Sequence, residues 1–174
     1  MLIFKDGSYV TNLPKVLVAI PAYNEEECIE GTILELKRVA PEFDFVVIND
    51  GSRDCTLELC TNLGCNVINM LINCGLTVGF QTAACYALEN DYDYMVQFDA
   101  DGQHRPEYIS ELVSKAQFDN ADIVIGSRFL SMRKDMSMRM FGSRMITFII
   151  KMLTGKRISD PTSGFRLFNR DVLK

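Results

Sequence analysis

The sequence predicts an α/β fold in which a mostly parallel central sheet is flanked by helices. Short apolar runs rich in β-branched and aromatic residues alternate with stretches whose apolar residues recur at helical spacing. Such strand-helix alternation is typical of parallel sheets covered on both faces. At 174 residues and 48% hydrophobic composition, the chain is sized for one domain with a substantial core.

The elements follow one another in a regular order. The predicted strands cover residues 15–20, 43–48, 65–70, 94–98, 123–125 and 165–168. The predicted helices cover residues 26–40, 55–63, 77–89, 106–117 and 138–153. Asp54 suits the N-cap of the second helix, Gly64 suits the position after its end, and Pro106 suits the first position of a helix. Residues 1–14 are expected to form a tail or an edge element, and residues 15–174 the domain itself.

Composition excludes several classes of protein. No stretch reaches the roughly 18 apolar residues of a membrane span, and the start of the chain lacks a signal-peptide pattern, so a cytoplasmic location is expected. The six cysteines contain no Cys-x-x-Cys pair or common zinc spacing and are expected to be reduced thiols. A pI near 4.9, without a basic patch interleaved with aromatic residues, argues against nucleic acid as a partner.

Charge is distributed unevenly along the chain. Residues 1–120 carry a net charge of −12 and residues 121–174 a net charge of +7. A basic final third indicates a surface for phosphates, either of a substrate or of an anionic membrane, although a solvated helix face is the simpler alternative. In the predicted helix 138–153, Arg139, Arg144 and Lys151 punctuate an apolar series. This helix is suited either to a membrane interface or to packing on the sheet.

Polar clusters follow four of the predicted strands, at residues 21–25, 49–52, 99–104 and 126–128. Ligands of open parallel sheets bind beyond the carboxyl ends of the strands, so these clusters are expected to share one rim. The chain contains neither a Gly-x-Gly-x-x-Gly fingerprint after the first strand nor a Gly-Lys-Ser/Thr phosphate loop. The sequence therefore disfavours a dinucleotide-binding Rossmann enzyme and a P-loop nucleotide-binding protein.

The most informative cluster is Asp99-Ala100-Asp101, directly after an apolar run. Two carboxylates at the end of a buried strand are costly to hold together unless a cation lies between them. Hard oxygen ligands favour Mg²⁺ or Mn²⁺, and such ions keep open positions for substrate phosphates. A solvated turn is the alternative, because Gly102 follows directly.

Five motifs together resemble one known family. They are Pro21-Ala22-Tyr23-Asn24-Glu25-Glu26, Asn49-Asp50-Gly51-Ser52-Arg53-Asp54, Phe98-Asp99-Ala100-Asp101-Gly102-Gln103-His104, Gly126-Ser127-Arg128-Phe129 and Thr162-Ser163-Gly164-Phe165-Arg166-Leu167. In order and spacing they resemble the family 2 glycosyltransferases, in the branch of dolichyl-phosphate mannose synthase and bacterial polyprenyl-phosphate glycosyltransferases. The resemblance covers residues 15–174 and identifies that range as a catalytic domain.

The resemblance implies a GT-A fold, a nucleotide-diphospho-sugar donor and transfer that inverts the anomeric centre. It implies a nucleoside pocket lined by Pro21, Tyr23, Asn24 and Glu25, with Asp50 near the base or ribose. It places the metal on Asp99 and Asp101, with Asp101 also counted as catalytic and Gln103 close by. It assigns Arg128 to a phosphate, and Asp160, the other catalytic candidate, to the acceptor side together with Arg166.

The chemistry of these residues can be argued separately. Breaking a glycosyl-diphosphate bond places charge on the leaving diphosphate, which a divalent ion stabilises. A polyprenyl phosphate acceptor is already largely deprotonated at pH 7, whereas a sugar hydroxyl needs a base. Asp160 suits the role of that base, the orientation of the acceptor, or a helix N-cap. Arg128 suits bidentate phosphate binding or a surface ion pair. His104 suits contact with the metal or donor, or a turn without a catalytic part.

Two departures from the family pattern concern the donor loop and the acceptor side. Thr77, Val78 and Ala83 stand where relatives often carry glycines. The chain ends at Lys174, where relatives continue, so a catalytic domain truncated at its C-terminus is expected. The leading hypothesis is a metal-dependent transfer to polyprenyl phosphate at the inner face of the membrane. The alternatives are transfer to a sugar hydroxyl in polysaccharide synthesis and a non-catalytic nucleotide-sugar-binding module.

Overall fold

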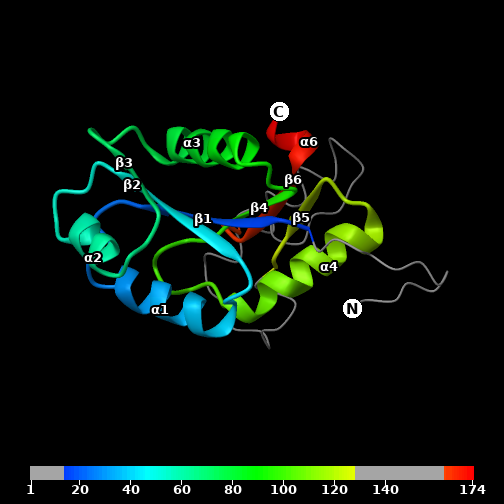
Figure 1. Cartoon of the computed structure of the whole chain (residues 1–174), viewed down its shortest axis with the longest axis horizontal. Helices are drawn as coiled ribbons and strands as arrows, with labels where there is room; N and C mark the ends of the chain where they lie inside the picture. The colour runs from blue at the N-terminus through cyan, green and yellow to red at the C-terminus, as the bar shows by residue number, and fades with distance from the viewer. Residues whose placement is uncertain (1–13, 128–162) are drawn as a thin grey trace, which may run out of the picture.

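The computed structural model describes residues 14–127 and 163–174, and a six-stranded sheet lies at the centre of this part (Figure 1). The strands are β1 (Val16–Ala22), β2 (Asp44–Asp50), β3 (Val67–Met70), β4 (Tyr94–Gln97), β5 (Ile123–Ile125) and β6 (Arg166–Asn169). Their order across the sheet is β3-β2-β1-β4-β6-β5. β6 is antiparallel to both β4 and β5, while β1 pairs in parallel with β2 and β4, and β2 with β3. Five strands therefore share one direction, which confirms the mostly parallel sheet.

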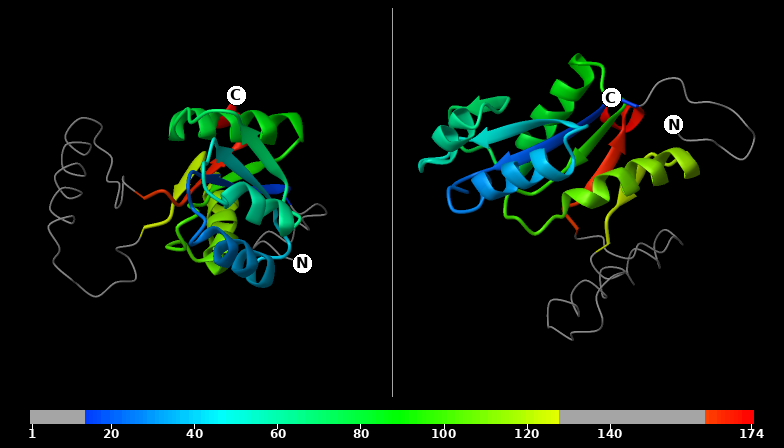
Figure 2. Two further views of the ribbon diagram at one scale, coloured as in Figure 1. Left: turned by 90° about the vertical axis from the view of Figure 1, so that its left-hand side faces the viewer. Right: turned by 60° about the horizontal axis from the view of Figure 1, so that its bottom comes forward.

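Helices cover both faces of the sheet (Figures 1 and 2). α1 (Ile29–Val39), α2 (Thr56–Asn62) and α4 (Ile109–Asp119) lie on one face, and α3 (Leu76–Glu89) lies on the other. The short α6 (Arg170–Leu173) follows β6 and contacts α3. A single 3-10 turn, η1 (Pro106–Tyr108), leads into α4. The layered α/β architecture is the one that the strand-helix alternation predicts.

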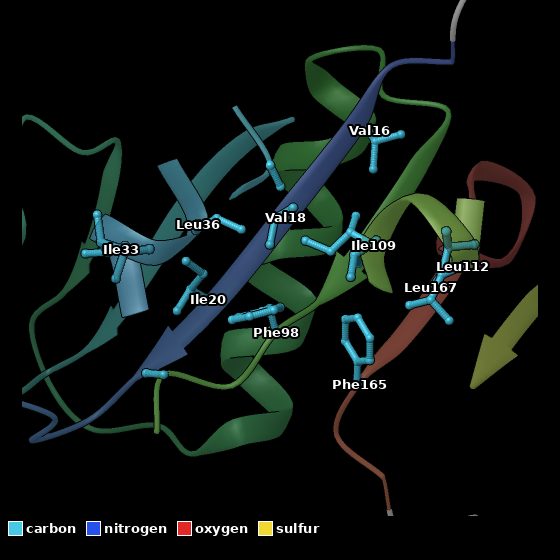
Figure 3. Close-up of a cluster of buried hydrophobic side chains, with 14 of the residues drawn as sticks. Val16, Val18, Ile20, Ile33, Leu36, Phe98, Ile109, Leu112, Phe165 and Leu167 are labelled. Atoms are coloured by element: carbon cyan, nitrogen blue, oxygen red, sulfur yellow. The ribbon is translucent and has the colours of Figure 1, made fainter. Parts of the chain in front are cut away.

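The core consists of two clusters, one on each face of the sheet. Val16, Val18 and Ile20 of β1 point toward α1 and α4, and Figure 3 shows them packed with Leu36, Ile109 and other buried side chains. Leu17 and Ala19, on the opposite face of β1, pack under α3. Each fully buried Ile or Leu contributes about 1.5–3 kcal/mol. The core therefore holds the strands, and thus the ends of the strands, in fixed relative positions.

α3 lies close to the sheet because its inward face carries small residues. Gly79, Ala83, Ala84 and Ala87 are its buried positions. A methyl group at Gly79 would meet Ile48 at 3.9 Å, an ordinary contact, so this glycine is not demanded by space. Ala83, one of the predicted departures from the family pattern, is 2% exposed in the core under α3.

Most predicted element boundaries differ from the observed ones by one to three residues, and three of the differences have a visible local cause. β2 runs to Asp50 instead of residue 48, because Asn49 and Asp50 still pair with neighbouring strands. α1 begins at Ile29 instead of residue 26, since the Glu26 backbone N–H donates to Asp54 across to the next loop. The helix predicted at residues 106–117 is divided into η1 and α4.

The predicted helix ends are mostly confirmed. Gly64 follows the end of α2 with φ of +65°, and the N–H groups of Gly64 and Cys65 donate to the Thr61 and Cys60 carbonyls in a Schellman arrangement. Pro106 begins η1 as predicted. Asp54 is not the N-cap of α2, a position that Cys55 occupies. The Asp54 carboxylate nevertheless accepts from the Thr56 N–H at 3.0 Å, so it satisfies a first-turn donor from one position earlier.

Two further predictions concern the cysteines and membrane-spanning helices. All six cysteines are free thiols, as predicted, and burial raises the pKa of Cys60 to about 11, which makes it unreactive. Within residues 14–127 and 163–174 no helix is long and apolar enough to cross a bilayer. The predicted helix 138–153 and most of the predicted N-terminal tail lie outside the described residues.

Candidate functional site

The predicted polar clusters meet at one end of the sheet, here called the carboxyl end because β1 to β5 finish there. Residues 21–25, 49–52, 99–104 and 126–127 follow or close β1, β2, β4 and β5. β6 runs the other way, so its first residue, Arg166, and the preceding Ser163 reach the same end. The topology thus confirms the shared rim that the sequence predicts, and it adds a fifth segment to that rim.

Asp99 and Asp101 lie on a tight turn directly after β4. The Asp99 backbone N–H donates to His104 Nδ1 at 2.9 Å, and Asp101 Oδ1 accepts from the Gln103 N–H at 3.0 Å. Gly102 has φ of +71°, a left-handed conformation that favours glycine. The Thr32 hydroxyl, from α1, donates to the Ala100 carbonyl at 2.9 Å. The turn is therefore fixed from both sides, with Gln103 on its exposed part.

The Asp99 carboxylate lies between His104 and the segment before β6. His104 Nε2 is 3.4 Å from Asp99 Oδ2. A Cβ on Gly164 would lie 2.1 Å from the same oxygen, so any larger residue there would displace the carboxylate or its own backbone. The Asp99 side chain keeps 35% of its surface exposed. Its surroundings therefore fix its position yet leave it accessible to a ligand.

Glu25 adds a third carboxylate to this end of the sheet. Partial burial raises its pKa first, and the negative charges of Asp101, Asp54 and Asp99 raise it further. Every charged group that shifts this pKa is a carboxylate. Mutual repulsion among these groups is relieved by a bound cation, so the electrostatics favour a positively charged ligand.

The carboxylates at this end of the sheet fit an open magnesium or manganese site, in which the ion keeps positions for other ligands. The part of the chain that the structure describes contains no cluster of three or more His, Cys, Asp or Glu side chains arranged to enclose an ion. Mg²⁺ is commonly held by one or two carboxylates together with substrate phosphates, not by an all-protein cage. Asp99 and Asp101 provide such a pair of hard ligands, and the remaining positions suit diphosphate oxygens.

The loops after β1 and β2 are joined by hydrogen bonds. Asn24, in a left-handed conformation with φ of 55°, donates its N–H to Ser52 Oγ at 3.0 Å and accepts from the Arg53 N–H at 2.8 Å. The Glu25 N–H donates to Thr56 Oγ1 at 2.8 Å. The predicted nucleoside-lining residues therefore belong to a rigid pair of loops, on which Tyr23 is 42% exposed and Pro21 is half-buried.

Asp50 is buried and has a structural task. Its two carboxylate oxygens accept from the Cys74 and Gly75 N–H groups at 2.7 and 2.8 Å. Gly51, with φ of +67°, brings the same loop against residue 72, where a Cβ would meet the Ile72 backbone at 2.5 Å. Asp50 thus holds the loop before α3 against the rim, and its predicted contact with a base or ribose stays a prediction.

Of the residues predicted for the acceptor side, the structure describes Arg166. Arg166 is half-buried, and its Nε donates to the Ser163 carbonyl at 2.6 Å. Arg128 and Asp160 lie outside the described residues, so their predicted roles stay predictions.

Sequence reasoning missed the residues that join the segments. Gly164 contacts Asp99, Thr56 and Ser52 accept from the loop after β1, and Glu26 accepts from the Cys55 N–H at 2.9 Å. All of them belong to or border the quoted motifs, but their partners are 28 or more residues away along the chain. The motif spacing marked these positions without revealing which loop each one contacts.

Solved structures share this architecture. The chain aligns with glucosyl-3-phosphoglycerate synthase from Mycobacterium tuberculosis, a crystal structure in complex with Mn²⁺ and uridine-diphosphate-glucose, with a TM-score of 0.73 and 19% identity. The alignment covers 91% of this chain and 57% of the other, so the chain spans less than two thirds of that protein. The likeness shows the fold, which is the GT-A fold expected from the sequence.

Sequence relatives and a family profile complete the comparison. The chain is 30% identical to polyprenol monophosphomannose synthase of Mycolicibacterium smegmatis, over 98% of this chain and 67% of the relative. It is 30% identical to undecaprenyl-phosphate mannosyltransferase of Micrococcus luteus, over 92% of this chain and 68% of the relative. The profile described as "Glycosyl transferase family 2" matches residues 17–174, which contain every described residue of the site. The resemblance seen in the motifs is therefore confirmed, and the chain belongs to glycosyl transferase family 2.

Proposed function

We propose that the chain is the catalytic domain of an inverting glycosyltransferase that moves a sugar from a nucleotide-diphospho-sugar to a polyprenyl phosphate. The observation that carries the proposal is the fixed Asp99-Ala100-Asp101 turn at the carboxyl end of the sheet. The acceptor class is supported by the names of the relatives, which include a polyprenol monophosphomannose synthase and undecaprenyl-phosphate transferases. A Mn²⁺ complex among the structural neighbours supports a divalent ion.

The donor is bound by residues of three loops in this proposal. Pro21, Tyr23, Asn24 and Glu25 line the nucleoside, Asp50 orders the loop beside it, and Asp99 and Asp101 hold Mg²⁺ or Mn²⁺ with Gln103 alongside. When bound, the ion supplies Lewis-acid stabilisation of the negative charge on the departing diphosphate. The rigid turn contributes by keeping the two carboxylates in place as that charge develops, so little reorganisation is needed during the reaction.

Basic residues of the final third of the sequence bind the acceptor in this proposal. Arg128 and Arg166 match phosphate geometry, and a polyprenyl phosphate brings its own anionic nucleophile. Asp160 orients this acceptor in the proposal and is not required to remove a proton. The lipid acceptor lies in a membrane, and the basic residues of 138–153 are attracted to anionic lipid headgroups. In this proposal the enzyme therefore works at the cytoplasmic face of the membrane.

The test is transfer of radiolabelled sugar by the full-length protein, with polyprenyl phosphate and oligosaccharide acceptors compared in parallel. We expect transfer to the lipid phosphate, lost in EDTA, and an Asp160→Asn variant that keeps appreciable activity. A hydroxyl acceptor instead predicts that Asp160→Asn loses about 10²–10⁴-fold in rate. Metal-dependent nucleotide binding without transfer to any acceptor would contradict the proposal and favour a binding module.

A further inference from the structure

His104 is a buried imidazole directly behind the Asp99 carboxylate. It is 8% exposed, and it is the only histidine in the chain. Its Nδ1 accepts the Asp99 backbone N–H at 2.9 Å, and its Nε2 is 3.4 Å from Asp99 Oδ2. One side chain thus contacts both the backbone and the carboxylate of the same aspartate, which lies five positions earlier in the chain.

The protonation of the ring follows from these contacts. A nitrogen that accepts a hydrogen bond carries a lone pair, so Nδ1 is unprotonated and the ring proton of the neutral imidazole lies on Nε2. The two nitrogens of an imidazole point away from each other, so while Nδ1 accepts the Asp99 N–H, Nε2–H cannot also point at the carboxylate of the same residue, and that carboxylate lies beside the ring. The ring therefore fixes Asp99 through its backbone N–H, which sets the direction in which the side chain leaves the turn. Groups that hold a metal-binding residue in place in this way tune the binding of the metal.

Aromatic side chains hold the imidazole in this position. Phe98 meets the ring edge-on at 5.4 Å between centroids, and Phe165 lies tilted against it at 5.1 Å. Phe165 itself is confined, because it lies over Gly126, where a Cβ would be 2.5 Å from the Phe165 ring. The ring therefore has little freedom to rotate, which makes its contact with Asp99 a lasting one.

We propose that His104 is a positioning residue that holds the Asp99 carboxylate in the orientation needed to bind the divalent ion of the donor diphosphate. The inference rests on the proposed function, since it concerns the same ion. Its Nδ1 is not available to the ion in this arrangement, because it accepts the Asp99 N–H, and its Nε2 carries the ring proton. The proposal also accounts for a buried imidazole directly behind two carboxylates that solvent reaches.

Three substitutions separate the anchoring of the Asp99 backbone from the packing of the ring. His104→Asn keeps an acceptor at the position of Nδ1. His104→Gln reaches the position of Nε2 instead and leaves the Asp99 N–H without this acceptor. His104→Phe keeps the packing against Phe98 and Phe165 and removes the acceptor.

The measurement is calorimetric titration of the full-length protein with UDP and with GDP, in Mn²⁺ and in EDTA, alongside the thermal midpoint of each variant. We expect Mn²⁺-dependent affinity to fall about 10–100-fold in His104→Gln and His104→Phe, and less in His104→Asn. Affinity in EDTA should stay unchanged in all three. In the metal-free wild type, histidine ¹⁵N spectra should show one imidazole with Nδ1 unprotonated.

The outcomes distinguish the inference from the proposed function. Folded variants that bind the nucleotide in Mn²⁺ as tightly as the wild type would overturn the inference alone. Losses that follow the thermal midpoints, with Asn no better than Gln, would assign His104 a purely structural role and also overturn it. A wild type without Mn²⁺-dependent binding of either nucleotide would overturn the proposed function, and the inference with it.

Discussion

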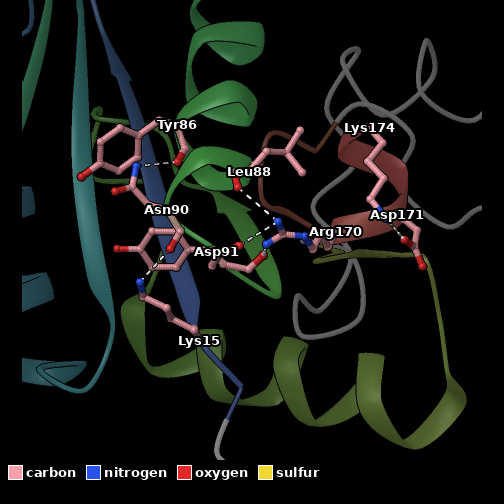
Figure 4. A network of polar contacts seen from close by, with 9 residues as sticks. Lys15, Tyr86, Leu88, Asn90, Asp91, Arg170, Asp171 and Lys174 are labelled. Atoms are coloured by element: carbon pink, nitrogen blue, oxygen red, sulfur yellow. Dashed lines mark hydrogen bonds and ion pairs between the residues drawn. The ribbon is translucent and has the colours of Figure 1, made fainter.

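The two ends of the sheet both carry dense polar networks, but their charges are balanced differently. At the amino end, opposite the site, each cation lies against an acceptor: Lys15 Nζ donates to the Asn90 carbonyl, and Arg170 pairs with Asp91 at 3.0 Å (Figure 4). The Lys15 backbone N–H also donates to Asp93. At the carboxyl end, the pKa of Glu25 is raised by partial burial and by three neighbouring carboxylates. The amino end thus holds cations among its acceptors, whereas the carboxyl end gathers negative charge that a cation would complement.

This difference separates stability from function within one fold. Strand ends at the amino end are joined by contacts that need nothing further, such as the Tyr92 hydroxyl donating to Asp44 at 3.0 Å. Backbone contacts at the carboxyl end hold the loops just as firmly, yet several carboxylates there stay open to solvent. We therefore expect substitutions at the amino end to change the free energy of unfolding alone, and substitutions at the carboxyl end to change ligand binding as well.

The largest expected effect concerns Asp99 and Asp101. Replacing either with Asn should reduce Mn²⁺-dependent affinity for a nucleoside diphosphate by about 100-fold or more, since a direct ligand contributes at least as much as its supporting groups. The free energy of unfolding should change little or rise, because one member of a repelling cluster becomes neutral. Calorimetric titration with and without EDTA measures the first quantity, and urea unfolding the second. If the wild type bound the nucleotide equally well in Mn²⁺ and in EDTA, no divalent ion would take part in binding, and the proposed difference between the two ends would be wrong.

The next effect concerns Gly164, which lies just before β6 and contacts the Asp99 side chain. A Gly164→Ala methyl group would lie 2.1 Å from Asp99 Oδ2, so we expect a loss of about 1–3 kcal/mol in stability together with weaker Mn²⁺-dependent binding. The matched control is Gly31→Ala in α1, where a Cβ meets nothing within 4 Å. That control should gain about 0.5–1 kcal/mol through helix propensity and bind the nucleotide unchanged. A Gly164→Ala protein with wild-type stability and binding would contradict the close contact.

Arg170 tests the amino end. Its guanidinium donates to the Tyr92 and Leu88 carbonyls at 3.3 and 3.2 Å in addition to Asp91, and thereby ties α6 to the end of α3. Arg170→Met should cost about 1–3 kcal/mol in the free energy of unfolding, because two partly buried carbonyls lose their donor. Lys174→Met, which removes only an exposed pair with Asp171, should leave the free energy of unfolding nearly unchanged. If Arg170→Met weakened Mn²⁺-dependent nucleotide binding at equal folded fraction, the separation of the two ends would be wrong.

The sequence predicted the order of strands and helices well because the hydrophobic period is a local property. It also placed Asp99, Asp101 and Glu25 on one rim, since parallel strands end together. It did not predict that β6 is antiparallel, because alternation within four residues carries no information about direction. Nor did it predict the partners of Asp50, Gly164 or His104, which depend on backbone approach between segments distant in the chain.

The smallest expected effect concerns the pH dependence of stability. A carboxyl group at each end has a shifted pKa, and the two shifts are opposite in sign. The pKa of Glu25 is raised in the folded protein by burial and by Asp101, so the folded state binds this proton more readily than the unfolded state does. Its stabilising contribution is complete below the ordinary pKa of 4.5 and is lost as the pH rises through the higher folded value. The pKa of Asp171 is lowered by its hydrogen bond with Lys174, so its contribution is present above 3.8 and lost as the pH falls.

Neutral variants at the two ends should therefore shift stability in opposite directions at pH 7. Glu25→Gln removes a repelling charge and should raise the free energy of unfolding by well below about 1 kcal/mol, because solvent screens a half-exposed group. That gain should disappear below about pH 4, where the wild-type carboxyl is protonated in both states. Asp171→Asn should instead lower stability at pH 7, with the difference also vanishing in acid.

Urea unfolding at a series of pH values measures both effects. Added Mn²⁺ with a nucleoside diphosphate should erase the advantage of Glu25→Gln, since a bound cation turns the repulsion around Glu25 into attraction. A gain for Glu25→Gln that persisted at pH 3, or that survived cation binding, would mean that repulsion among the carboxylates is not what distinguishes this end of the sheet.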